Sequence, residues 1–196
     1  METLAFFGRT LGFSFAAGVN LYATVAILGL SARYGWVSLP PEYQAFDNDW
    51  VIGAAIVLYV FEFFADKIPW VDTAWDALHT VIRPIGGALI AVATLGEASG
   101  GATAAIALLG GAVAAGSHAT KAATRLVVNS SPEPFSNWLL SFAEDGLVIG
   151  LGLLALKFPL AALGVSLLLI GLIGLMLALV VRAVRRRRMH VRGAGA

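Results

Sequence analysis

The sequence predicts an all-α, polytopic membrane protein, a bundle of about six transmembrane helices in one domain. The chain has 196 residues, of which 59% are hydrophobic and only 13% are charged, whereas soluble domains carry about 25% charged residues. Several apolar runs approach the length of about 20 residues that a helix needs to cross a bilayer. These runs are continuous rather than alternating, so we expect helices and not the strands of a barrel.

Composition also limits the chemistry that the chain can perform. There is no cysteine, which excludes disulfides, thiol chemistry and cysteine metal ligands. The first residues lack a basic segment followed by a cleavage site, so we expect the N-terminus to be retained. We expect the lipid bilayer as the main partner, no nucleic-acid partner and no cofactor.

The first half, residues 1–98, is expected to contain three spans, which cover residues 10–32, 50–62 and 85–95. The first span is apolar apart from a few polar residues that include Asn20. Pro69 should end the second span, because proline removes a backbone donor and clashes with the preceding turn. A short amphipathic helix follows, and Pro84 should bend the chain from it into the third span.

The second half, residues 99–184, is expected to contain three more spans, which cover residues 102–126, 146–156 and 160–184. The fourth is made almost wholly of Ala and Gly. Small residues let helices approach closely in lipid, so we place it at the centre of the bundle. A basic tail, residues 185–196, begins with four arginines (Arg185, Arg186, Arg187 and Arg188) that we expect to bind anionic lipids.

The distribution of Lys and Arg predicts the orientation. With six spans, 11 of the 13 Lys and Arg residues fall on the side that also carries both termini. The positive-inside rule then places both termini in the cytoplasm, with the chain in a bacterial inner membrane. Two short matches also suggest two inverted three-helix halves: segment 16–18 (AAG) recurs at 114–116, and segment 51–53 (VIG) recurs at 148–150.

The densest group of charged residues lies within segment 61–83. Its members Asp72, Asp76, His79 and Arg83 are spaced four, three and four apart, so they share one helix face, as do Glu62 and Asp66. One interpretation is a cation or proton site, or the acidic wall of a solute path, since charge inside a membrane is costly and usually functional. The alternative is a structural network of salt bridges on a helix at the membrane interface.

A basic stripe on the fourth span has the same helical spacing. His118, Lys121 and Arg125 are three and four residues apart. We expect them to pair with acidic residues such as Asp72, Asp76 or Glu62. They could instead hold a phosphate, a lipid head group or another anion, or extend to the interface. Residues 129–145 are expected to form a loop after this span, in which segment 131–137 (SPEPFSN) makes a defined turn, either re-entrant or cytoplasmic.

These same stretches resemble a family of small bacterial integral membrane proteins known only as domain of unknown function 4126. The matching stretches are GVNLY at 18–22, EFFADKIPWVDTAWD at 62–76, RP at 83–84, HATKAATR at 118–125, NSSPEPFSN at 129–137 and ED at 144–145. The resemblance implies a membrane protein over most of the chain. It implies no activity.

Three functional hypotheses remain open. The leading one is a small transporter or channel for an ion or small solute, and not an enzyme. Its path residues would be Asn20, Glu62, Asp66, Lys67, Asp72, Asp76, His79, Arg83, His118, Lys121, Arg125, Glu133 and Asn137. The second is a lipid-binding or assembly protein that transports nothing and could form a homo-oligomer. The third is a metal-dependent membrane enzyme, with a divalent ion held by Asp72, Asp76 and His79.

Overall fold

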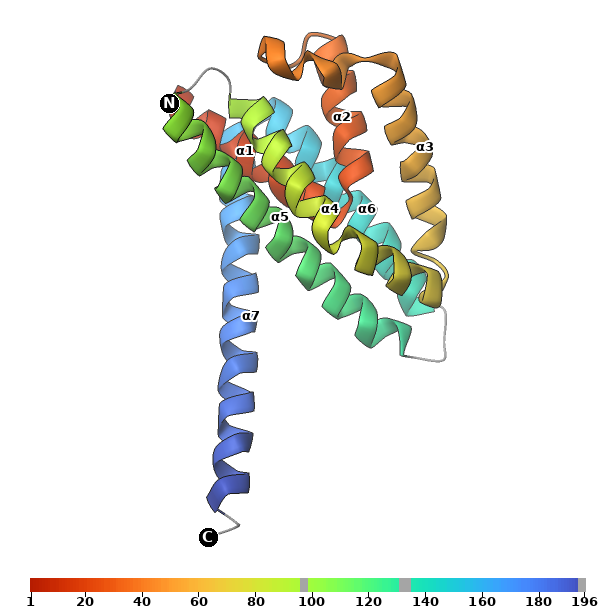
Figure 1. The fold of residues 1–196 in the computed structure, drawn as a ribbon, viewed down its shortest axis with the longest axis vertical. Coiled ribbons are helices and arrows are strands. Elements are labelled where there is room, and N and C mark those ends of the chain that lie inside the picture. Colours follow the sequence, from red (N-terminus) through yellow and green to blue (C-terminus); the bar gives the residue numbers. More distant parts are fainter. Residues whose placement is uncertain (96–98, 131–134, 194–196) are drawn as a thin grey trace.

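A computed structural model of the protein describes residues 1–95, 99–130 and 135–193, and this part of the chain is helical, with no strand. In chain order the elements are α1 (Glu2–Val19), α2 (Leu21–Arg33), the 3-10 helix η1 (Pro41–Asp47), α3 (Asp49–Ala65), α4 (Pro69–Leu95), α5 (Gly100–Asn129), α6 (Phe135–Lys157) and α7 (Pro159–Gly193). Figure 1 shows α1 at the centre, and α1 contacts α4, α5, α6 and α7.

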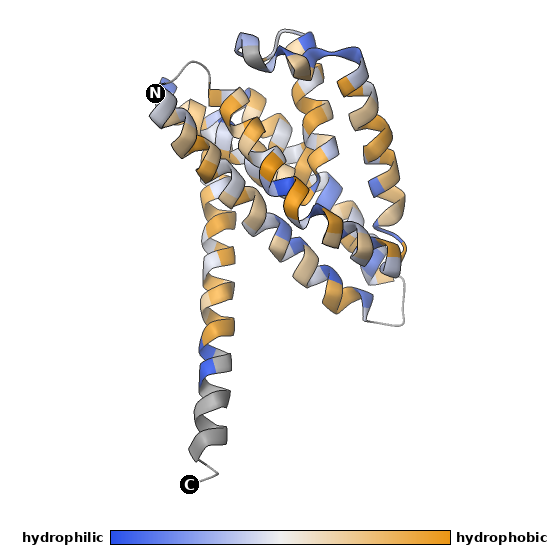
Figure 2. Ribbon diagram, in the orientation of Figure 1, coloured by the Kyte–Doolittle hydropathy of each residue, from blue (hydrophilic) through white to orange (hydrophobic). Residues whose placement is uncertain are grey.

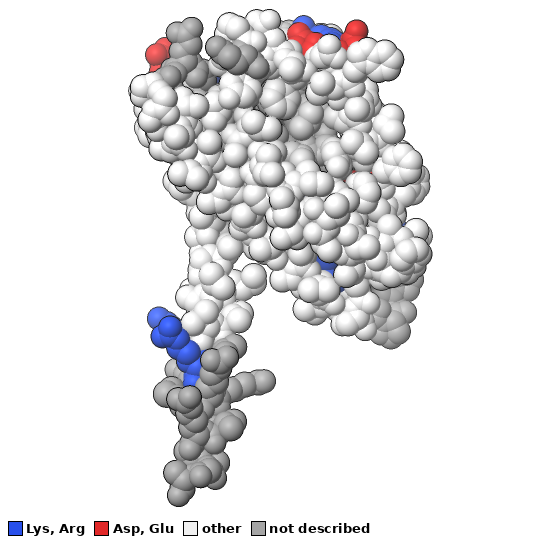
Figure 3. Space-filling model, viewed as in Figure 1, with Lys and Arg blue, Asp and Glu red and all other residues white. Residues whose placement is uncertain are grey.

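Four of these helices are long and apolar enough to cross a membrane: α4, α5, α6 and the part Pro159–Arg182 of α7. Helix α3 is apolar too, but it has 17 residues. The chain therefore has the helices of an integral membrane protein. Figure 3 agrees, because in this view the charged side chains appear near the ends of the molecule and the broad surface between them is uncharged.

The expected single span over residues 10–32 is wrong, because the structure has two helices there. Helix α1 ends at Val19 and α2 starts at Leu21. Between them Asn20 is extended, with φ −147° and ψ 101°, and its side-chain oxygen accepts a hydrogen bond of 3.0 Å from the Ala23 amide. Asn is a strong helix N-cap, and this capping explains why the chain restarts a helix at this residue.

Two other helices are longer than the expected spans. Helix α4 continues through Pro84 from Pro69 to Leu95, so the amphipathic segment supplies part of the length of the third span; membrane helices tolerate a proline where neighbours satisfy the freed backbone groups. Helix α6 begins at Phe135 rather than near residue 146, so most of the expected loop 129–145 is helical. The expected turn 131–137 lies partly outside the described residues.

The path of the chain places the two ends of the molecule. Figure 1 shows α1 running from the N-terminus into the bundle and α2 returning to the end of the molecule from which α1 came. The N-terminal part of α1 packs against the start of α7, where a Cβ on Gly8 would lie 1.8 Å from the Pro159 carbonyl oxygen. The N-terminus therefore lies beside the α6–α7 turn, and α7 runs from there to the opposite end of the molecule (Figure 1).

Small residues let the central helices approach closely. A Cβ on Gly110 of α5 would lie 2.2 Å from the Ala91 Cβ of α4, and a Cβ on Gly18 of α1 would lie 1.9 Å from the Ser117 hydroxyl of α5. The small residues thus permit close approach, but the expectation that the Ala- and Gly-rich helix lies at the centre of the bundle is wrong, because only 22% of the α5 span is buried, against 44% for α4 and for α6. Figure 2 shows a second feature of these two helices: hydrophilic segments of α4 and α5 lie within an otherwise apolar bundle.

Candidate functional site: a buried charged core at a helix break

Nine charged side chains gather inside the bundle, and we call them the charged core. Its six carboxylates are Glu62, Asp66, Asp72, Asp76, Glu144 and Asp145, and its three cations are Arg83, Lys121 and Arg125. They come from α3, α4, α5 and α6, and all are buried except Glu144, whose side chain is 12% exposed. Such burial is stable only if the charges are paired and hydrogen-bonded.

Arg83 is the most enclosed cation of the charged core. One of its terminal nitrogens lies 2.6 Å from the Glu62 carboxylate, and both side chains are fully buried. The other terminal nitrogen donates to the Gly18 carbonyl at 3.2 Å, contacts His118 Nδ1 at 2.9 Å and lies 3.4 Å from the Asp76 carboxylate. Arg83 thus joins α4 to α1, α3 and α5.

Lys121 and Arg125 lie one turn apart on α5 and share carboxylates. Lys121 Nζ lies 3.0 Å from Asp66, 3.4 Å from Glu62 and 3.7 Å from Glu144. Arg125 pairs with Glu144, with Asp66 at 3.2 Å and, more weakly, with Asp72 at 3.8 Å. The two cations therefore have little capacity left for a further anion.

The break at Asn20 is part of this arrangement. The last carbonyls of a helix have no partner within it. At the end of α1, Arg83 donates to the Gly18 carbonyl and Lys121 donates to the Val19 carbonyl at 3.2 Å. The Asn20 side-chain amide donates to Asp145 at 3.3 Å. The charged core thus satisfies the broken backbone that it surrounds, and cations lie at the negative end of the α1 dipole.

The two histidines of α4 and α5 extend the polar network. His79 Nε2 lies 2.9 Å from the Tyr22 hydroxyl, and its Nδ1 lies 2.7 Å from the Trp75 carbonyl. His118 contacts Arg83 through Nδ1 and the Thr80 hydroxyl through Nε2 at 3.3 Å. These partners fix how each ring is used: His79 Nδ1 has to donate to a carbonyl, and His118 Nδ1 has to accept from the arginine, which cannot give up its proton.

The charges of the core do not balance. Six carboxylates face three cations, and several carboxylate oxygens have no hydrogen-bond partner among the described residues. These are one oxygen each of Glu62, Asp66, Asp72 and Asp145, and both oxygens of Asp76. Asp145 forms no ion pair within the described part of the chain, and its contact is the one with Asn20. The core is thus rich in unused acceptors.

Lys67 lies at the edge of the core, in the turn between α3 and α4. Its ammonium donates to the Phe63 carbonyl at 2.8 Å and lies 3.2 Å from the centre of the Phe63 ring. Partial burial lowers the pKa of Lys67, while the charges of Asp145 and Asp66 oppose that effect. The positive charge of Lys67 therefore offsets part of the acidic excess of Asp145 and Asp66, although Lys67 forms no direct ion pair with either within the described residues.

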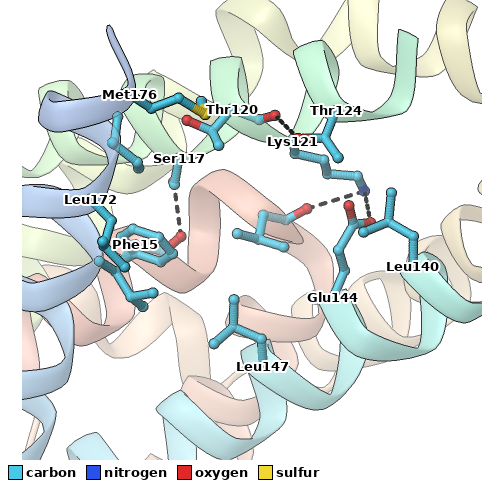
Figure 4. Close-up of a pocket in the computed structure, with 13 residues that line it drawn as sticks. Phe15, Ser117, Thr120, Lys121, Thr124, Leu140, Glu144, Leu147, Leu172 and Met176 are labelled. Atoms are coloured by element: carbon cyan, nitrogen blue, oxygen red, sulfur yellow. Dashed lines mark hydrogen bonds and ion pairs between the residues drawn. The ribbon is translucent and has the colours of Figure 1, made fainter. Parts of the chain in front are cut away.

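Two hollows in the surface reach the charged core. One, of about 230 Å³, lies between α4 and α5 and is lined by Thr73, Thr80, Asp76 and Arg125 among others. The other is a groove of about 260 Å³ bounded by α1, α5, α6 and α7, and Figure 4 shows Lys121 and Glu144 at its polar end. Both hollows are large enough for water molecules to reach charged side chains that are otherwise buried.

The structure brings together most of the residues that the sequence singled out. The expected pairing of the basic stripe with the acidic residues is present, in Lys121 with Glu62 and Arg125 with Asp72. Asn137 also belongs to the site, because it accepts from Arg125 at 2.7 Å and donates to the Asp66 carbonyl at 3.1 Å. Glu133 lies outside the described residues.

Sequence reasoning missed Glu144 and Asp145 as site residues. Both were assigned to a loop, although the apolar residues of WLLSFA just before them fit a continuing helix. Tyr22, one of the polar residues expected in the first span to line a path or to form interhelical hydrogen bonds, contacts His79 of α4.

The proposed metal ligands do not converge. Asp72 accepts from the Asn129 amide at 2.7 Å, whereas His79 is directed at Tyr22 and Trp75. Within the described ranges no group of three or more Asp, Glu and His side chains is arranged to hold a metal ion. The geometry thus gives the metal-enzyme hypothesis no support.

The fold and the site define a class: a helical membrane protein with a buried ionic core around an interrupted helix. Within this class, the chain belongs to the family described as domain of unknown function (DUF4126), whose model matches residues 8–185. The match extends beyond the stretches that carried the resemblance in the sequence. No curated protein and no solved structure matches the chain.

Proposed function

We propose that the protein is a membrane transporter or channel whose charged core carries protons. The observation that supports this most directly is the excess of carboxylates, six against three cations, with oxygens of Asp76 and Asp145 that accept no hydrogen bond from the described residues. Unpaired buried charge is costly, so the excess has to be offset by something that binds to it. Protons are the natural choice, because chains of Asp, Glu and His in membranes serve as proton relays.

The interrupted helix supports a transport function. In many transporters, helices broken inside the membrane place their free ends at the site of the coupled ion, and irregular backbone is tolerated there only within protein or beside water. The break at Asn20 lies within protein, and the free end of α1 lies at the charged core. Its carbonyls accept from Arg83 and Lys121, and the Asn20 side chain contacts Asp145. Protonation of Asp145 would therefore change the hydrogen bond that Asn20 makes at the break.

The path of the chain suggests a topology with fewer crossings than six. Helix α2 has 13 residues, or about 20 Å at 1.5 Å per residue, which is too short for a core of about 30 Å. We therefore propose that α1 and α2 form a re-entrant hairpin and that α3 to α7 cross the membrane. The N-terminus would then lie opposite the arginine-rich, cytoplasmic C-terminus, and not on the same side.

The inverted repeat, lipid binding and homo-oligomer formation, which the sequence suggested, stay hypotheses. Two inverted halves would place a break in α5 at His118, the position equivalent to Asn20 when segment 16–18 corresponds to 114–116, and α5 is continuous through His118. Binding of anionic lipid by the arginine tail and homo-oligomer formation stay predictions. The lipid-binding hypothesis stays a prediction too.

The test is proton flux in liposomes that contain the purified protein and a pH-sensitive dye, driven by a potassium diffusion potential. We expect flux above that of protein-free liposomes, and a decrease of about tenfold or more in Asp145→Asn, which removes a proton-accepting group. Asp47→Asn is the matched control, because Asp47 is an exposed carboxylate that pairs with Arg33 far from the core. Its flux should equal that of the wild type.

The melting temperature of each variant separates a lost path from a lost fold. Asp145→Asn should melt close to the wild type, since the isosteric amide keeps contact with Asn20. Intact wild-type protein that passes no protons would overturn the proposal. An Asp145→Asn variant with undiminished flux would remove Asp145 from the path.

A further inference from the structure

Helix α3 lies at the edge of the bundle, and its two halves are attached in different ways. Figure 1 shows α3 beside α2, outside the group of helices around α1. Four of its 17 residues are buried, namely Ile52, Ala55, Glu62 and Ala65. Ile52 in the first half packs against α2, where a Cβ on Gly29 would lie 2.7 Å from its side chain. In the second half of this fully described helix, Ala65 is the one buried apolar residue.

The second half of α3 is attached to the bundle through charge. Glu62 lies 2.6 Å from Arg83 and 3.4 Å from Lys121. Asp66, which follows the last residue of α3, lies 3.0 Å from Lys121 and 3.2 Å from Arg125. Each of these four ion pairs thus joins a carboxylate at the end of α3 to a cation of α4 or α5.

Apolar contacts cannot replace these ion pairs in a bilayer. Lipid chains are as apolar as the side chains of a helix, so an apolar helix face gains no hydrophobic free energy by leaving lipid for protein. The edge-to-face contact of Phe63 with Phe142 of α6 is a contact of this kind. The ion pairs are therefore the main attraction between the second half of α3 and the rest of the bundle.

Both carboxylates can bind a proton without first losing a hydrogen bond. One oxygen of Glu62 and one of Asp66 accept no hydrogen bond from the described residues. Apart from their three cationic partners, the charged or titratable groups around them are Asp72 and His79 on α4, Glu144 and Asp145 on α6, Lys67 in the turn after α3, Tyr59 on α3 and Tyr22 on α2. Protonation would remove the negative charge that attracts the three cations.

The cations would keep other partners if α3 moved away. Arg83 also lies 3.4 Å from Asp76 of its own helix. Lys121 lies 3.7 Å from Glu144 of α6, and Arg125 pairs with the same carboxylate. Release of α3 would therefore leave none of these cations as an uncompensated buried charge, which is the most costly consequence of breaking a buried ion pair.

We propose that Glu62 and Asp66 form a proton-operated latch. While both are charged, they hold the second half of α3 on the bundle; when they are protonated, that half moves away and opens the charged core on the side of α3. The role of the latch in transport rests on the proposed function, but the movement can be measured without any flux. Absence of flux would overturn the proposed function, whereas an α3 that does not move would overturn the latch alone.

The experiment measures distances between two spin labels on the full chain in liposomes by electron paramagnetic resonance. The sequence has no cysteine, so labels can be attached at introduced ones: Phe61→Cys in the second half of α3 and Val127→Cys on α5, both at exposed positions. As the pH falls from about 7.5 towards about 4, the usual pKa of carboxyl groups, we expect a population whose distance is longer by about 5 Å, half a helix diameter. Glu62→Gln/Asp66→Asn should show this longer distance at every pH.

The matched control pair is Trp50→Cys with Val127→Cys, because Trp50 is exposed in the first half of the same helix. Its distance should stay constant in every sample. The melting temperature shows whether Glu62→Gln/Asp66→Asn is folded; if it is not, the pH series of the otherwise unaltered chain decides. An unchanged distance of the first pair, in the folded variant or over the pH series, would overturn the proposal. Equal lengthening of both pairs would also overturn it, because the whole bundle would then have loosened.

Discussion

Replacing Arg83 by leucine tests how the charged core holds the bundle together. Arg83 pairs with Glu62 at 2.6 Å with both side chains fully buried, and it also satisfies the Gly18 carbonyl. Removing one partner of a buried pair leaves an uncompensated charge and typically costs about 3–5 kcal/mol. The Gly18 carbonyl would lose its partner as well. We therefore expect Arg83→Leu to destabilise the fold by about 3–5 kcal/mol.

The double variant Arg83→Leu/Glu62→Leu separates pairing from packing. Replacing both members of a buried ion pair by apolar residues is often neutral, so the double variant should recover most of the loss. Lys121, which also contacts Glu62, keeps Asp66 at 3.0 Å as a partner. In a chain of this length about 1 kcal/mol shifts the melting temperature by about 2–4 °C, so the single variant should melt about 6–20 °C lower.

The measurement is thermal unfolding in detergent, followed by circular dichroism at fixed protein concentration. Arg33→Leu is the matched control, because Arg33 pairs with Asp47 and Asp49 at exposed positions where water screens the charges. It should melt within a few degrees of the wild type. The reasoning would be refuted if Arg83→Leu melted like Arg33→Leu, or if the double variant were no more stable than the single one.

Two further predictions concern packing and the helix break. A methyl group on Gly110 would lie 2.2 Å from the Ala91 Cβ, whereas one on Gly116 of the same helix would meet no atom within 4 Å. Gly110→Ala should therefore lower the stability of the fold by about 1–3 kcal/mol, and Gly116→Ala should leave it unchanged or raise it. The melting temperatures of the two variants test this. Asn20→Ala should cost about 0.5–2 kcal/mol through loss of the α2 cap. It should also increase amide hydrogen exchange at the start of α2, and an unchanged exchange rate at Ala23 would contradict the capping role.

The sequence allowed the charged core to be predicted in its main parts. The spacing of Asp72, Asp76, His79 and Arg83 places them on one face of a helix whatever its tilt. In a chain this apolar, such a face has to meet a complementary one, and the basic stripe of α5 was the available partner. Local periodicity therefore predicted which helix faces would meet without any knowledge of the fold.

The helix break and the contribution of α6 could not be predicted in the same way. Asn20 interrupts an apolar run whose length fits a single span, and its role becomes clear only when Arg83 and Lys121 are seen to satisfy the free carbonyls. Those contacts join residues more than 60 positions apart. Asp145 was assigned to a loop because charge in an apolar context usually marks a helix end, and only the tertiary contact with Asn20 makes its burial intelligible.

The composition of the charged core argues against a purely structural role. A network that only braced helices would be expected to match its charges, because each unmatched buried ion costs several kcal/mol. Three unmatched carboxylates would together cost about as much as the 5–15 kcal/mol by which a typical protein is stable. We therefore expect the folded protein to hold protons among these acids, as the proposed function requires. Sites that can gain or lose such a cation beside an interrupted helix are those where binding and conformation are coupled, and this coupling is what transport requires.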